Sequence, residues 1–207
     1  PPRSTLFPYT TLFRSIFLSI LLTVGTVGSA LAHTGHGTHS LMEGLVHPFG
    51  LDHLLAMLAV GIWSVSALPA HKVWQRPATY MLALVVSAVL GAAGVTLPFL
   101  EHAIALSVSL FGVMLIVAAQ PVPKAVGLSL VAVAASLHGL AHGAETPDSG
   151  FMGYAVGFVL TTGLLHLSGV GMGLSIRRWL AAGKHRTALS GLGGVLGMTG
   201  LYLFSQL

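Results

Sequence analysis

Histidine is the residue type in this sequence best suited to chemistry, because eleven histidines stand beside five acids and no cysteine. His138 and His142 are four residues apart, and Glu145 follows three residues later, so the three side chains share one face of a helix. Two imidazoles at this spacing form a common metal-binding geometry. The pattern therefore predicts a divalent-cation site. The alternative is that His142 and Glu145 lie at a surface and are simply solvated.

A second group of titratable residues lies in the run His47-Pro-Phe-Gly-Leu-Asp-His53. In an unbroken helix, residues five or six apart fall on different faces. Pro48 lacks an amide hydrogen and Gly50 relaxes the backbone, so we expect a broken turn here that lets both histidines and Asp52 converge. Asp52 then either binds the ion or fixes the tautomer of a neighbouring histidine.

Three further histidines are candidate metal ligands. His166 lies roughly 22 Å along a long apolar segment, where we expect it to face the interior of a helix bundle. It is either a deeper step on an ion route or a structural residue that bonds a carbonyl or Thr162. His33 and His36 belong to a His-rich tract, whose composition predicts capture of a divalent cation from solution.

The composition restricts the class of protein that carries these residues. Hydrophobic residues make up 54%, charged residues only 7%, and the mean hydropathy is +0.87. So few charges cannot cover a soluble monomer, and nine Lys and Arg along an apolar chain do not form a nucleic-acid-binding patch. These values predict an integral membrane protein in the lipid bilayer. The sequence lacks the glycine-rich phosphate loop of an ATPase, so we expect no intrinsic ATPase. We also expect that the protein is not an enzyme and holds no permanently bound cofactor.

Residues 1–32 are interpreted as a signal peptide that is cut after Ala32, because an apolar run follows Arg3 and Arg14 and precedes a small-x-small pattern. The alternative is an uncleaved first helix. Residues 1–15, with their repeated Thr-Leu-Phe triplets, do not resemble an ordinary signal start and are interpreted as non-native. No function is assigned to them.

Residues 33–207 are predicted to form one all-α transmembrane domain, a bundle of six helices. Each hydrophobic segment has the ~20 residues that a helix needs to cross the hydrocarbon core. Long apolar runs rich in Leu, Val, Ala and Gly favour helices over a barrel. The expected spans are approximately 43–68, 78–98, 103–120, 124–142, 151–175 and 188–206.

The distribution of charge predicts the orientation of the bundle. Lys and Arg accumulate in short cytoplasmic loops, and a periplasmic mature N-terminus places every basic residue beyond the signal segment inside. Those residues are Lys72, Arg76, Lys124, Arg177, Arg178, Lys184 and Arg186. Both termini are then periplasmic, in a bacterial inner membrane. Within this frame, the candidate ligands are ordered by depth from the periplasmic side inward.

At these motifs the sequence resembles the HupE/UreJ family of membrane proteins, which are associated with nickel hydrogenases and ureases. The resemblance rests on the His-Pro-x-x-Gly-x-Asp-His-x-x-x-Met run from His47 to Met57, the run from His138 to Glu145, and Leu-Leu-His166 with Gly169. It covers nearly all of the chain beyond residue 32. The His-x4-Asp-His element is also similar to the signature of nickel and cobalt permeases.

The resemblance implies secondary uptake of nickel or cobalt, which would supply enzymes such as hydrogenase or urease and involve their maturation proteins as partners. The residues it marks as metal-handling are His47, Asp52, His53, His138, His142 and Glu145. Ligand chemistry alone leaves zinc and copper open. Two other functions stay open as well: a zinc-dependent intramembrane hydrolase, and a metal-binding accessory protein that does not transport.

Overall fold

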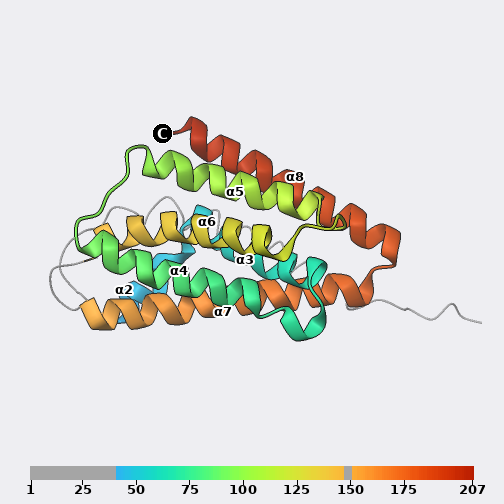
Figure 1. The fold of residues 1–207 in the computed structure, drawn as a ribbon, viewed down its shortest axis with the longest axis horizontal. Helices are drawn as coiled ribbons and strands as arrows, with labels where there is room; N and C mark the ends of the chain where they lie inside the picture. Colours follow the sequence, from blue (N-terminus) through green and yellow to red (C-terminus); the bar gives the residue numbers. More distant parts are fainter. Residues whose placement is uncertain (1–40, 147–150) are drawn as a thin grey trace, which may run out of the picture.

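The computed structural model describes residues 41–146 and 151–207, and these residues form helices without any strand (Figure 1). The helices are, in chain order, α2 (Leu41–Val46), η1 (His47–Phe49), α3 (Leu51–Ala67), η2 (Ala70–Lys72), α4 (Gln75–Ala92), α5 (Leu100–Ile116), α6 (Lys124–Ala144), α7 (Phe151–Trp179) and α8 (Ala182–Ser205). The predicted signal peptide, together with His33 and His36, lies outside the described residues.

Helix α3 is the centre of the bundle. Eleven of its 17 residues are buried, and it packs against α4, α5, α7 and α8. Helices α4 and α6 form one closely packed pair and α5 and α8 form another, and the second pair lies above the first in Figure 1. Gly61 permits the close approach of α3 to α7, because a Cβ atom there would lie 2.6 Å from the His166 carbonyl oxygen. Helices α4 to α8 run roughly along the long axis of the molecule (Figure 1).

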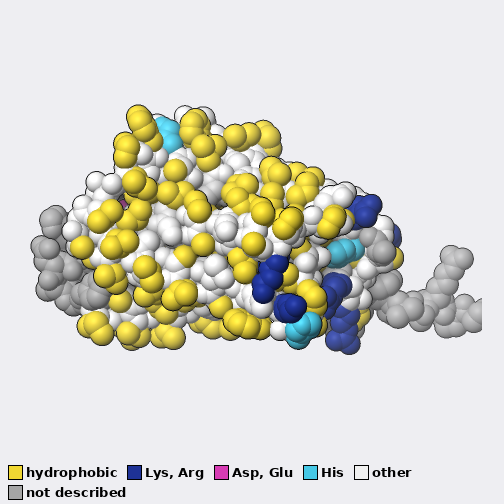
Figure 2. Space-filling view, in the orientation of Figure 1, with side chains coloured by type: hydrophobic (Ala, Val, Ile, Leu, Met, Phe, Trp, Pro, Cys, Tyr) yellow, Lys and Arg dark blue, Asp and Glu magenta, His cyan; other side chains and the backbone are white. Residues whose placement is uncertain are grey.

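The outer faces of the helices carry large apolar side chains, including Leu82, Leu164 and Val195, which are 61–69% exposed. Figure 2 shows apolar side chains spread along the flank of the molecule. Four helices in the described part are long and apolar enough to cross a membrane, and the bent pair α2/α3 would make a fifth. These features are those of a multi-pass helical membrane protein.

Each of the six predicted hydrophobic segments contains a helix, but the boundaries and the number of crossings differ from the prediction. Helix α5 has 17 residues, fewer than the ~20 of a full crossing. Helix α4 ends at Ala92, before the expected boundary at 98, and Gly94 follows with a positive φ of 89°. Four or five crossings therefore meet the criterion of length and composition, and a sixth at α5 stays a prediction.

Charge separates along the axis of the bundle as predicted. The basic residues lie at η2, at the first turns of α4, α6 and α8, and at the last turn of α7, and they gather at one end in Figure 2. Glu101 lies in the first turn of α5 and Glu145 follows α6, so these acids lie at the opposite end. The side of the membrane that each end faces stays a prediction.

Candidate metal-binding site

The predicted break before α3 is confirmed. The pair α2/η1 makes an angle of 75° with α3, and Gly50 between them has an extended backbone with φ −51° and ψ 137°. Pro48 starts the short η1 turn because its missing amide hydrogen costs nothing at a helix start. This break turns His47 and His53 toward the same neighbour, His142 at the end of α6.

Four histidines form a continuous chain of contacts at the acidic end of the bundle. His47 Nε2 lies 2.8 Å from His142 Nδ1, and His142 Nε2 lies 3.2 Å from His53 Nδ1. His53 Nδ1 in turn lies 3.3 Å from His138 Nδ1. The predicted pairing of His138 with His142 on α6 is thereby joined to both histidines of the first motif.

These contacts define two groups whose ligand atoms all lie within 4.8 Å of one another. We call His47, His142 and Glu145 the outer triad, and His53, His138 and His142 the inner triad. His142 belongs to both. Three imidazoles, or two imidazoles with a carboxylate, are ligand sets that divalent transition metals accept.

Exposure falls steeply from the outer to the inner triad. The side chains of Glu145 and His47 are 56% and 29% exposed, whereas that of His142 is 14% exposed. His53 and His138 are only 1% and 0% exposed. The two triads therefore lead from the solvent at one end of the bundle into its interior.

Glu145 follows the last turn of α6, and its amide donates to the Ala141 carbonyl. Its Oε2 lies 3.4 Å from His47 Nε2 and 3.5 Å from His142 Nδ1. Hydrogen bonds with His142 and His47 lower the pKa of the Glu145 carboxyl well below its usual range. The carboxylate of Glu145 is therefore ionised at neutral pH.

The tautomer of His138 is fixed by a residue that sequence reasoning missed. Ser107 of α5 donates its hydroxyl hydrogen to the Ile104 carbonyl, at 2.7 Å. Its oxygen therefore accepts from His138 Nε2, which lies 3.3 Å away. The lone pair of His138 is then on Nδ1, which faces the inner triad. A serine bonded to its own helix gives no signal in a single sequence.

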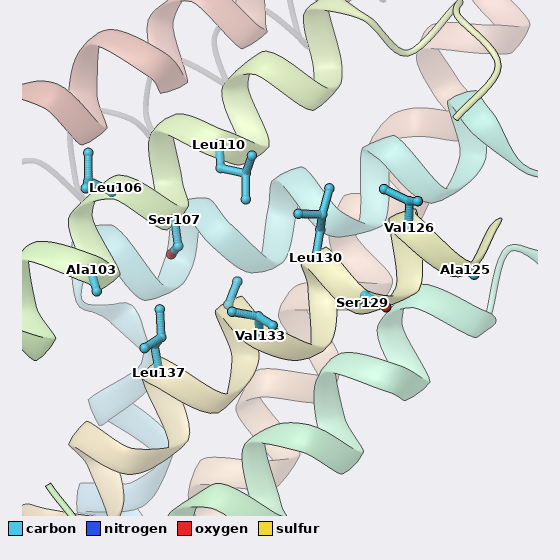
Figure 3. A pocket seen from close by; sticks show the side chains of 11 residues that line it. Ala103, Leu106, Ser107, Leu110, Ala125, Val126, Ser129, Leu130, Val133 and Leu137 are labelled. Atoms are coloured by element: carbon cyan, nitrogen blue, oxygen red, sulfur yellow. The ribbon is translucent and has the colours of Figure 1, made fainter. Parts of the chain in front are cut away.

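Ser107 also lines an apolar groove of about 620 Å³ between α5 and α6. In Figure 3, Leu106 and Leu110 of α5 face Leu130, Val133 and Leu137 of α6 across this groove. The groove contains no histidine or acid. The residues of the two triads thus lie outside this groove.

Phe158 of α7 closes the site on another side. Its ring centroid lies 4.9 Å from that of His142, 5.2 Å from that of His53 and 5.9 Å from that of His47. Because Phe158 is only 5% exposed, it shields these imidazoles from lipid and from bulk water. Sequence reasoning missed this residue as well, since a phenylalanine in an apolar helix carries no distinctive signal.

Asp52 was predicted either to bind the ion or to fix the tautomer of a neighbouring histidine, and the structure places it in neither role. It lies half-buried in the first turn of α3, and within the described residues it belongs to neither triad and bonds none of the histidines. Its neighbour His53 takes the inner position because consecutive residues of a helix point to different sides.

His166 lies apart from both triads. It is buried on α7, and its Nδ1 donates to the Thr162 carbonyl at 2.9 Å, so the structural bond considered for it exists. Its Nε2 therefore carries the lone pair, and it has no partner among the described residues. The ring of Tyr80 lies beside it, with centroids 4.7 Å apart.

Comparison with known proteins identifies relatives of this chain. The family model for HupE / UreJ protein matches residues 21–203 of the chain. Protein HupE of Rhizobium leguminosarum bv. viciae is 41% identical over 145 residues, which cover 69% of this chain and 75% of that protein. No solved structure matches the chain. With both motifs and most of its length inside the match, the chain belongs to the HupE/UreJ family.

Proposed function

We propose that this protein is a secondary transporter that takes up nickel or cobalt ions across the bacterial inner membrane. The observation that carries the proposal is the fall in exposure along contacting ligands, from 56% at Glu145 and 29% at His47 to 1% at His53. Ligands ordered in this way replace the water around an ion in steps as it enters a membrane protein. The outer triad would capture the ion and the inner triad would hold it.

His166 supports a route that continues inward. Its free lone pair on Nε2 lies in the buried interior, on the same helix as Phe158 and about two turns farther along α7. A carbonyl bond to Nδ1 fixes the orientation of the ring. In the proposal His166 receives the ion after the inner triad, before release toward the basic end.

The choice of metal rests on the family. Imidazole and carboxylate ligands suit nickel, cobalt, zinc and copper, and intrinsic affinity favours copper over nickel. The association of HupE/UreJ proteins with nickel hydrogenases and ureases favours nickel or cobalt as the cargo. Such enzymes and their maturation proteins would receive the ion.

The inner triad also fits a second function, although it supports that function less than it supports transport. Three histidines are a ligand set of catalytic zinc, so a zinc-dependent intramembrane hydrolase has the necessary ligands. That function needs a group that activates the zinc-bound water. Asp52 was the candidate, but it belongs to neither triad. A metal-binding accessory protein that does not transport would need only the two triads and would not need the buried His166.

Uptake of radioactive nickel and cobalt into proteoliposomes tests these functions. We expect uptake by the wild type, loss of uptake in His53→Ala and at least a tenfold decrease in His166→Ala. His71→Ala is the matched control, because His71 is exposed at η2 and lies outside both triads. A wild type that binds the ions but never accumulates them would reject transport in favour of the accessory function. Zinc-dependent hydrolysis without uptake would support the hydrolase.

A further inference from the structure

The imidazole of His142 stands between the two triads and presents a different nitrogen to each. Its Nδ1 lies 2.8 Å from His47 Nε2 and 3.5 Å from Glu145 Oε2. Its Nε2 lies 3.2 Å from His53 Nδ1. The outer triad thus uses one side of the ring and the inner triad uses the other.

A neutral imidazole has one nitrogen with a free lone pair, while the other carries the hydrogen. A metal ion needs the lone pair, so His142 can ligate in one triad at a time. When an ion is in the outer triad, His142 Nε2 keeps its hydrogen and donates to His53 Nδ1. When an ion is in the inner triad, the hydrogen is on Nδ1 and faces the Glu145 carboxylate.

The other two ligands of the inner triad are already oriented for binding. Ser107 holds the hydrogen of His138 on Nε2, so its Nδ1 faces the triad. When the outer triad is occupied, His53 Nδ1 accepts from His142 Nε2, so the hydrogen of His53 is on Nε2, which lies 3.4 Å from the Thr162 hydroxyl as its acceptor. Of the three inner ligands, His142 is therefore the one whose ring hydrogen must move when the ion arrives.

We propose that a single ion occupies the outer and inner triads in turn, and that His142 ligates it in both positions through opposite ring nitrogens. In this step His142 releases the proton on Nε2 to water and takes up a proton from water at Nδ1, so the charge of the ring is unchanged. Two ions at once would share one neutral imidazole and repel each other at short range. The inference rests on the proposed function only in treating the ion as cargo.

Binding of Co²⁺ to the purified full-length chain tests the proposal without transport. His33, His36 and His39 are replaced by alanine in every protein compared, including the one called wild type, so that the His-rich tract adds no ion to the count. Three variants separate the triads: Glu145→Gln removes an outer ligand, His138→Ala removes an inner ligand, and His142→Ala removes a ligand from both. Equilibrium dialysis gives the number of ions per chain, and the visible absorption of Co²⁺ reports the ligand set. His71→Ala again serves as the control.

We expect one Co²⁺ per wild-type chain and one in each of Glu145→Gln and His138→Ala. The spectra of these two variants should differ, because only His138→Ala binds through a carboxylate. His142→Ala and the double variant Glu145→Gln/His138→Ala should each bind at least a hundredfold more weakly than the wild type, because neither retains a complete triad.

Two Co²⁺ ions per wild-type chain at saturation would overturn the proposal, as would wild-type affinity in His142→Ala. If His142→Ala fails to fold, the comparison of Glu145→Gln with His138→Ala still tests the proposal. Identical Co²⁺ spectra in these two variants would exclude separate ion positions in the outer and inner triads. Failure of uptake with this binding pattern intact would reject the transport function and leave the shared ligand standing. Uptake with two ions bound per chain would support the transport function and overturn the proposal that His142 is a shared ligand.

Discussion

Ser107 and His138 are joined by a hydrogen bond whose direction is determined, because the serine hydroxyl already donates to the Ile104 carbonyl and must accept from His138 Nε2. This bond connects α5 to the deepest histidine of the inner triad. Outer-shell bonds of this kind orient a ligating imidazole and typically contribute 10–100-fold to metal affinity.

Ser107→Ala should therefore weaken Co²⁺ binding at the inner triad about tenfold to a hundredfold, because His138 loses the partner that fixes its tautomer. The effect is measured best in the Glu145→Gln background, where only the inner triad is complete. Ser129→Ala is the matched control, since Ser129 lines the same groove but lies exposed near the start of α6. Equal affinities for Ser107→Ala and Ser129→Ala would show that the bond does not orient His138.

Asp52→Asn should leave the stoichiometry and the visible spectrum of bound Co²⁺ unchanged, because Asp52 belongs to neither triad. The sequence left open whether this residue ligates the ion or fixes the tautomer of a histidine, and among the described residues Asp52 neither belongs to a triad nor bonds a histidine. Spectroscopic titration of the purified variant gives the answer. A changed Co²⁺ spectrum in Asp52→Asn would place its carboxylate among the ligands.

Gly61→Ala should destabilise the protein by about 1–3 kcal/mol, because the added methyl group meets the backbone of α7 beside His166. Thermal unfolding in detergent measures the effect. Gly163→Ala on α7 is the matched control, since a Cβ there meets nothing within 4 Å. It should be neutral or stabilising, as alanine favours a helix over glycine. Equal destabilisation by the two changes would contradict the close packing of α3 on α7.

Arg76 should stabilise the basic end of the bundle. Its guanidinium lies 3.4 Å from the ring centroid of Trp63 and donates to the Trp63 carbonyl at 2.9 Å, and the residue is 2% exposed. Arg76→Ala should lower the free energy of unfolding by about 2–4 kcal/mol, since a desolvated stacking contact and a charged hydrogen bond are both lost.

Arg178→Ala provides the control for Arg76→Ala. Arg178 also stacks on a tryptophan, Trp179, but at 5.3 Å and on an exposed surface. Its removal should change the unfolding temperature by no more than about 2 °C, because exposed contacts of this type contribute little. An equal loss of stability in the two variants would show that burial does not strengthen the Arg76 contact.

The sequence by itself determined the class of protein, the helical segments and most of the candidate ligands. Apolar runs fix helices because a lipid-exposed backbone must satisfy its own hydrogen bonds. The spacing of His138, His142 and Glu145 fixes a shared helix face, and Pro48 with Gly50 predicts the break at which α3 begins. All of these are local consequences of periodicity and backbone chemistry.

The tertiary structure decided which of these residues meet. It brought His47 and His53 to opposite nitrogens of His142, left Asp52 outside both triads, and placed Ser107 behind His138. Such contacts join residues that are 31–95 positions apart in the chain, so they depend on how whole helices pack. Local periodicity carries no information about that packing, because it fixes the face of each helix and not the neighbour that the face will meet.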